Sequence, residues 1–215
     1  MEFSAASDRS LLVLFGNEIS PAIHHEVLRL LRAFESPPLG ILNLHPGFAS
    51  VLIDFDLRRM DHTAVEELVR NRLARVENAS VGAVRKVEIP VRYGGEWGPD
   101  LEDVARHAGI APGEVIHLHS GAAYLVYFLG FSPGFPYLGG LPSVLATPRL
   151  AVPRKSVPAG SVAIGGSQTG IYPMESPGGW RIIGKASIRL FDLAADPPAL
   201  LRAGDRVRFV EQPAA

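Results

Sequence analysis

Apolar residues recur along the first 80 positions with spacings that predict short strands and amphipathic helices. Residues 11–15 form a continuous apolar run that Gly16 and Asn17 end, a pattern typical of a buried strand. Ser20 followed by Pro21 marks a helix start, because proline fits the first helical position. The apolar side of this helix is expected to be Ile23, Val27, Leu30, Leu31 and Phe34.

Two more strands are expected at residues 41–44 and 50–55, joined by a His-Pro-Gly turn. Asp61 is the expected N-cap of a second helix, whose apolar residues fall between positions 65 and 76. Residues 8–80 therefore predict the order β-α-β-β-α, in which two helices cover one face of a small sheet.

The pattern changes after residue 85, where apolar and polar residues alternate over 87–91 as in a strand. Asp100 is expected to cap a helix over 101–108 that Gly109 ends, and Pro112 to start another that ends near His119. Further strands are expected at 124–129, 161–164, 180–183, 187–191 and 206–210. Many short strands with Gly/Pro corners favour a closed or nearly closed barrel. The predicted class is α+β, with an N-terminal α+β domain at 1–85 and a β-barrel domain at 86–215.

Composition excludes several classes of function. The net charge of −1 favours neither nucleic acid nor an anionic membrane as a partner. The absence of cysteine excludes disulfides, thiolate nucleophiles and cysteine-based zinc sites, and fits a cytoplasmic protein. The N-terminal residues lack a signal-peptide pattern, and no apolar run approaches the length of a membrane span.

Residues 130–184 contain 11 of the 22 glycines and 8 of the 18 prolines, together with Val and Ile runs and five aromatic residues. Such a composition predicts buried apolar segments joined by many sharp bends, and tight bends of the backbone can expose N–H groups that bind anions. For any one glycine pair a hairpin turn or barrel corner is the favoured explanation, whereas each basic residue is equally explained as surface charge. The candidate substrate or anion contacts are Arg154, Lys155, Gly165, Gly166, Gln168, Thr169, Tyr172 and Ser176.

The same block has no histidine, no aspartate and one glutamate, Glu175. Since proton transfer usually needs such groups, we expect this surface to bind and stabilise charge while a partner chain completes the reaction centre. No catalytic residue is assigned, and no metal site is expected, because His117 and His119 fall in a predicted helix and do not share a face. The sequence at 179–186 approaches a P-loop, but Ala186 replaces the Ser or Thr that holds magnesium. Lys185 remains a possible anion contact.

Three long motifs carry a family resemblance: GFSPGFPYLGGLP at 130–142, VPRKSVPAGSVAIGGSQTGIYP at 152–173 and SPGGWRIIG at 176–184. They resemble the KipI family, also called allophanate hydrolase subunit 1 or 5-oxoprolinase subunit PxpB. The resemblance implies that the barrel is cyclophilin-like. It also implies a KipA/PxpC-like partner and a LamB/PxpA-like partner.

Together, such subunits resemble the ATP-dependent 5-oxoprolinase, a hydrolase that opens pyroglutamate, a small carboxylate, to glutamate. The resemblance leaves the ATP site shared with, or located on, a partner subunit, and this chain is expected to be inactive alone. Two alternatives stay open: a KipI-like inhibitor of a histidine kinase, and a carboxyltransferase component of a urea carboxylase or allophanate pathway.

Overall fold

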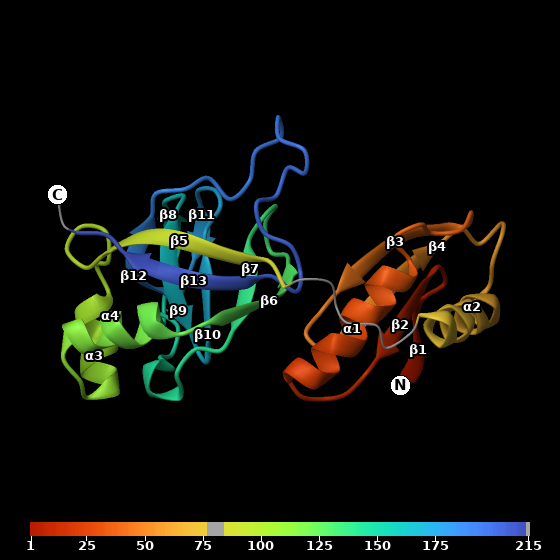
Figure 1. Cartoon of the computed structure of the whole chain (residues 1–215), viewed down its shortest axis with the longest axis horizontal. Coiled ribbons are helices and arrows are strands. Elements are labelled where there is room, and N and C mark those ends of the chain that lie inside the picture. Colours follow the sequence, from red (N-terminus) through yellow and green to blue (C-terminus); the bar gives the residue numbers. More distant parts are fainter. Residues whose placement is uncertain (77–83, 214–215) are drawn as a thin grey trace. The chain divides into compact units, whose positions relative to one another are not determined.

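The computed structural model describes residues 1–76 and 84–213. The chain divides into two compact units, Met1–Ala83 and Val84–Ala215 (Figure 1). Each unit has a hydrophobic core of its own. None of the helices in the described residues has the length and apolarity needed to span a bilayer.

The first unit is a four-stranded antiparallel sheet with two helices on one face (Figure 1). In spatial order its strands are β1 (Glu2–Ser7), β2 (Ser10–Leu14), β4 (Ser50–Phe55) and β3 (Ile41–Pro46). The helices are α1 (Pro21–Ala33) and α2 (His62–Arg75). Alternate residues of β2 and β4 pack with the apolar sides of both helices in one core, which places both helices on the same face.

Both helices of this unit begin where their capping residues predict. The Ser20 hydroxyl accepts a hydrogen bond from the Ile23 N–H at 3.3 Å, and the Asp61 carboxylate accepts one from the Ala64 N–H at 2.8 Å. The order β-α-β-β-α is confirmed over the described residues; positions 77–80 of the expected segment lie outside them. The sequence pattern missed β1, because this largely exposed edge strand has no apolar alternation and forms by pairing with β2.

The second unit is a closed barrel whose strands follow the order β10-β7-β6-β13-β5-β12-β9, with β9 pairing back to β10 (Figure 1). All neighbours are antiparallel except β13 and β5, which are parallel. The barrel strands are β5 (Lys86–Tyr93), β6 (Tyr124–Leu129), β7 (Pro136–Gly139), β9 (Ser161–Gly165), β10 (Gln168–Ile171), β12 (Arg181–Ala186) and β13 (Arg206–Glu211). This barrel and the mixed composition of elements confirm the predicted α+β class.

Three further features complete the barrel unit. Strands β8 (Arg154–Val157) and β11 (Ser176–Gly178) pair with each other as a separate two-stranded ribbon. Helices α3 (Leu101–Ala108) and α4 (Pro112–Gly121) bury apolar residues in the same core as the barrel interior. A 3₁₀ turn, η1, spans Ser143–Leu145.

The expectation of a strand over residues 187–191 is wrong. Strand β12 ends at Ala186, and beyond it Phe191 forms only an isolated bridge with Ala199. The barrel is already closed there, since β13 occupies the other edge of β5 and β9 the other edge of β12, so no open edge remains for another strand. Four strands of three or four residues were also not predicted: β7, β8, β10 and β11. Gly or Pro interrupts the alternating pattern in β7, β10 and β11, and β8 has only one apolar residue, Val157.

A chain of hydrogen bonds crosses the barrel interior. Tyr93 Oη lies 2.8 Å from His119 Nδ1, and His119 Nε2 lies 3.0 Å from Thr169 Oγ1. The Thr169 hydroxyl donates its only proton to the Ala163 carbonyl at 3.0 Å, so it accepts from His119 Nε2–H. The complete burial of His119 lowers its pKa from 6.5 to about 3, so the imidazole is neutral at neutral pH and its Nδ1 accepts from the Tyr93 hydroxyl.

This buried imidazole predicts a pH dependence of stability. Well above pH 6.5, His119 is neutral in both the folded and the unfolded protein. Below pH 6.5, His119 of the unfolded chain binds a proton, whereas His119 of the folded barrel stays neutral until about pH 3. Stability therefore falls as the pH falls, and His119 alone accounts for a loss of about 3 kcal/mol between pH 6.5 and 4. We expect His119→Gln to flatten this part of the profile. Urea unfolding followed by tryptophan fluorescence measures it, since both tryptophans, Trp97 and Trp180, belong to the barrel unit.

The matched control is His107→Gln, because His107 is exposed on α3. This control should keep the wild-type slope. Equal slopes for wild type and His119→Gln between pH 6.5 and 4 would contradict the assignment of a buried neutral imidazole.

Candidate functional site

An aromatic cavity of about 110 Å³ lies on the outer side of the barrel, where the glycine-rich segments meet. Its lining consists of Phe131, Phe135, Tyr137, Arg149, Tyr172, Pro177, Gly178, Gly179 and Trp180. The rings pack mostly edge to face: the Phe135 centroid lies 5.4 Å from that of Tyr172 and 5.6 Å from that of Trp180. Such contacts fix the orientation of each ring, so the cavity has rigid walls.

Two aromatic rings of the cavity lie directly on glycine backbone. A Cβ atom at Gly165 would stand 2.6 Å from the Trp180 ring, and one at Gly178 would stand 2.3 Å from the Tyr172 hydroxyl. Glycine is required at both positions because any side chain would displace the ring. Gly166, with φ of +64°, begins the two-residue turn between β9 and β10, so this glycine pair is a hairpin corner as well as a ring platform.

Phe131 stands at the edge of the cavity with its side chain 63% exposed. It is the one non-glycine residue with positive φ, +66°, in the described chain. A bulky residue in this conformation is strained, and such strain concentrates at ligand sites. Its ring meets those of Phe135 and Tyr172 edge to face, at 5.4 and 6.4 Å between centroids. The segment after β6 therefore holds an apolar ring open to solvent beside the cavity.

The only ionisable groups of the lining are Arg149 and two tyrosines. The guanidinium carbon of Arg149 lies 5.6 Å from the Trp180 ring centroid, a cation–π contact, and Arg149 forms no ion pair with a described carboxylate. Burial raises the pKa of Tyr172; the hydrogen bond with the Trp180 backbone and the charges of Arg149 and Arg154 oppose this. Tyr172 is thus an uncharged phenol at neutral pH, and the cavity carries one net positive charge.

Arg154, one of the expected anion contacts, is bound to a carboxylate of the chain itself. Its guanidinium donates two hydrogen bonds, of 2.7 and 2.9 Å, to Asp100, which is 4% exposed. The same carboxylate accepts the Ile182 N–H at 2.7 Å. Asp100 therefore ties the ribbon strand β8 and the barrel strand β12 to the start of α3. Asp100 is the N-cap residue of α3, as expected, but its side chain makes no capping hydrogen bond, because Arg154 and the Ile182 N–H occupy the carboxylate.

The other expected contacts lie in different environments. Tyr172 lines the cavity, while Ser176 follows on β11 with a buried hydroxyl that has no partner in the described chain. Lys155 is exposed on β8. Gln168 starts β10 on the same face as Gly170, above which Phe135 and Trp180 pack. Thr169 points the opposite way, into the barrel, where His119 binds it.

Three residues that line this cavity were not among the contacts predicted from the sequence: Arg149, Phe131 and Trp180. Each was visible as an isolated charge or ring in the glycine-rich block, but nothing in the sequence distinguished Arg149 from Arg154. The distinction depends on Asp100, which is 54 positions from Arg154. Likewise, the block lacks histidine, yet the fold brings His119 against Thr169 from outside it.

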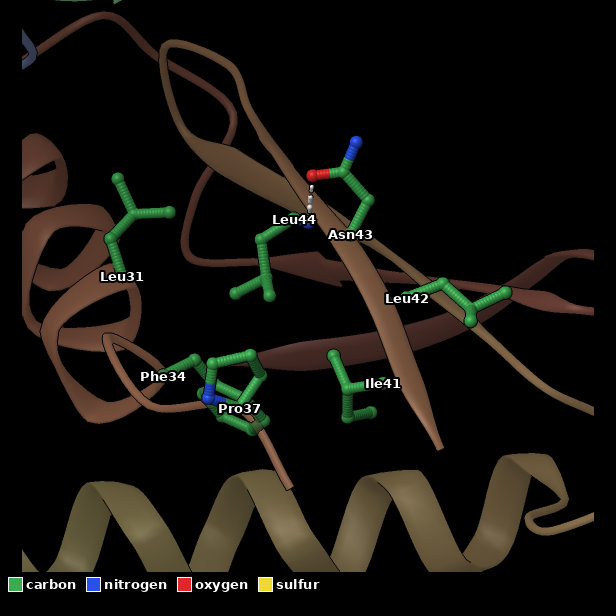
Figure 2. Close-up of a pocket in the computed structure, with 7 residues that line it drawn as sticks. All are labelled: Leu31, Phe34, Pro37, Ile41, Leu42, Asn43 and Leu44. Carbon is green, nitrogen blue, oxygen red and sulfur yellow. Dashed lines mark hydrogen bonds between the residues drawn. The ribbon is translucent and has the colours of Figure 1, made fainter. Parts of the chain in front are cut away.

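Two other hollows have polar side chains that are already bound within the chain. One, of about 260 Å³ in the first unit, is lined by Leu31, Phe34, Pro37, Ile41, Leu42, Asn43 and Leu44. Figure 2 shows Leu42 pointing away from the apolar side chains of this hollow, and its one polar side chain, that of Asn43, binding the Leu44 N–H. The second hollow, of about 500 Å³, lies beside α3. There Asp103 binds both Arg106 and Arg181, at 2.8 and 3.0 Å. No group of side chains suited to a metal ion occurs among residues 1–76 and 84–213.

The fold and its glycine-rich motifs place the chain in a known class. The chain belongs to the family described as the carboxyltransferase domain, subdomain C and D, whose model matches residues 1–201. Over 94% of this chain it is 42% identical to the B subunit of 5-oxoprolinase from Bacillus subtilis, strain 168, and covers 89% of that protein. It is 47% identical to the protein of the same name from Escherichia coli O157:H7, over 90% of this chain and 88% of that one. The resemblance to the family of 5-oxoprolinase subunit PxpB is thereby confirmed.

A solved structure extends the similarity to the fold. The crystal structure of TTHA0988 superposes with a TM-score of 0.87 over 97% of this chain, at 38% identity. This chain covers only 41% of that longer chain.

The Asp100 carboxylate is expected to be a main support of the site. Asp100→Ala leaves the Arg154 guanidinium partly buried without its counter-charge and the Ile182 N–H without an acceptor, which should cost about 3 kcal/mol in the free energy of unfolding. Urea unfolding measures this cost. The control is Asp103→Ala: this carboxylate is 40% exposed, so its loss should cost less than about 1 kcal/mol. Equal stability of the two variants would refute the supporting role of Asp100.

Proposed function

We propose that this chain is a subunit of an ATP-dependent 5-oxoprolinase, and that its aromatic cavity binds the ring of 5-oxoproline. Support comes from the two relatives named as a subunit of 5-oxoprolinase, at 42% and 47% identity. The single observation that carries the choice of site is the aromatic cavity with one uncompensated cation, Arg149, at its wall.

The cavity suits a small, flat acid. Its volume of about 110 Å³ is well below that of pockets for drug-sized ligands, and so favours a five-membered ring over a nucleotide. The faces and edges of Phe135, Tyr172 and Trp180 would enclose the apolar carbons of the ring. Arg149 would bind the carboxylate through two parallel hydrogen bonds, which Arg154 cannot offer while Asp100 holds it.

Ring opening would add water at the lactam carbon and break its C–N bond. ATP would activate that carbon by transferring its terminal phosphoryl group to the lactam oxygen and leaving as ADP, and a second water would release the phosphate together with glutamate. The cavity lining includes no carboxylate and no imidazole to move protons at the reacting amide. Tyr172, with its raised pKa, can donate a hydrogen bond to the lactam oxygen but is a poor base. Proton transfer would therefore fall to KipA/PxpC-like and LamB/PxpA-like partners, so that this chain alone is inactive.

A second candidate is a carboxyltransferase component, which the description of the matching family favours. In that case the cavity would receive the planar acceptor of a carboxyl group instead of a lactam. Purified complex given ATP and 5-oxoproline, or given a carboxylated biotin carrier and urea, separates the two functions by its product. Inhibition of a histidine kinase and a cytoplasmic location stay predictions.

Arg149 provides the sharpest test of the substrate site. With both partner subunits present, Arg149→Gln should raise KM for 5-oxoproline about 10- to 100-fold and change kcat little, because it removes a charge-assisted carboxylate contact worth about 1.5–3 kcal/mol. Steady-state release of glutamate measures both constants.

The control variant for this test is Arg189→Gln, which removes an exposed arginine paired with Asp192. It should leave both constants at their wild-type values. A KM for Arg149→Gln within twofold of wild type would rule out the cavity as the carboxylate site.

A further inference from the structure

The outer wall of the barrel carries a second cationic site, distinct from the aromatic cavity, formed by Arg92, Lys185 and Trp97. Arg92 on β5 and Lys185 on β12 are directly opposed in the antiparallel ladder. Val91 and Tyr93, the neighbours of Arg92, and Ala186, a neighbour of Lys185, pack in the barrel core, so the Arg92 and Lys185 side chains point outward. The Arg92 guanidinium carbon lies 5.9 Å, and the Lys185 ammonium 5.2 Å, from the centroid of the Trp97 ring.

This arrangement leaves two positive charges uncompensated. Like charges directly opposite each other in a sheet repel, and the described residues provide no carboxylate in an ion pair with either Arg92 or Lys185. The Nε atom of Arg92 is buried and has no hydrogen-bond partner in the described chain. An indole face attracts cations through its quadrupole but carries no net negative charge, so Trp97 does not neutralise Arg92 or Lys185.

The turn that holds Trp97 over these cations is tightly specified. Gly94 and Gly95 both have left-handed φ, +66° and +52°, and the Gly94 carbonyl accepts from the N–H groups of Trp97 and Gly98 at 3.0 and 2.9 Å. A Cβ atom at Gly98 would stand 2.1 Å from the Ile183 carbonyl oxygen, so glycine is required there. The backbone of this turn thus fixes the position of the Trp97 Cα atom beside β12, and the contacts with Arg92 and Lys185 hold its ring.

We propose that Arg92 and Lys185 bind the phosphate groups of a nucleotide, with Trp97 shielding one side of the contact. This inference rests on the proposed function, which needs ATP, and on the aromatic cavity being too small for it. Two adjacent cations match the charge of a di- or triphosphate better than that of a single carboxylate. Lys185, which a P-loop would place after a strand, here binds phosphate from within β12.

Thermal unfolding of the full chain, with inorganic pyrophosphate as probe, tests this site. A hundredfold excess of pyrophosphate over its Kd should raise the Tm of the wild-type barrel by about 5–10 °C. Adenosine, which has no phosphate, should have no effect, and ATP should compete with pyrophosphate. Isothermal titration should show affinity falling as salt concentration rises.

Arg92→Gln and Lys185→Gln should each weaken pyrophosphate binding about tenfold or more. Without ligand, each should unfold at or above the wild-type Tm, because each removes one member of a repelling pair. Arg189→Gln is the matched control and should bind and unfold as wild type does. A lower Tm for both site variants, together with unchanged pyrophosphate affinity, would overturn the proposal and make the cluster a structural cation–π contact.

Failure of this inference can be told from failure of the proposed function. In the reconstituted complex, wild-type KM for ATP in both Arg92→Gln and Lys185→Gln, with normal glutamate release, would reject the phosphate site and leave the 5-oxoprolinase function standing. Phosphate binding by the chain in a complex that releases no glutamate would reject the function and leave the site standing.

Discussion

The candidate substrate site depends on the absence of a Cβ atom at two positions. Trp180 lies on Gly165 and Tyr172 on Gly178, each at a distance that no side chain would permit. Because the two glycines belong to different strands, β9 and β11, the rings connect the barrel to the ribbon and form the cavity between them. Glycines of this block therefore serve two purposes: some form turns, and others leave room for an aromatic ring to pack on the backbone.

Ion pairs with carboxylates of the chain itself decide which arginine and lysine side chains remain available to a ligand. Asp100 binds Arg154, Asp103 binds Arg181 and Asp205 binds Arg85. The first two pairs connect α3 to strands β8 and β12, and the third joins the residues that directly precede β5 and β13, so all three serve the fold. Three other cations, Arg149, Arg92 and Lys185, contact tryptophan rings instead and form no ion pair with a described carboxylate. Contact with a tryptophan ring, without a carboxylate partner, is therefore the feature shared by the two surfaces that we assign to anions.

The barrel interior adds a constraint of its own. The hydrogen bonds of His119 to Tyr93 and Thr169 connect α4 to strands on opposite sides of the barrel. Thr169 alternates with Gln168 and Gly170, whose face carries the aromatic cluster, so the buried imidazole also fixes the position of one wall of the cavity. A polar network that is fully satisfied gives this part of the core a unique arrangement.

Elements with local causes, and the family, could be predicted from the amino-acid sequence. Ser20 and Asp61 start their helices because capping is a contact between residues three apart, and the long glycine-rich motifs indicated the family. Other features depended on how the folded chain brings distant segments together: Asp100 pairs with Arg154, and Thr169 turns inward to His119. Residues 187–191 form no barrel strand for a similar reason, because the barrel is already closed by other strands. These outcomes depend on partners 50 or more positions away, or on whether a sheet edge is still open, and no local pattern records either.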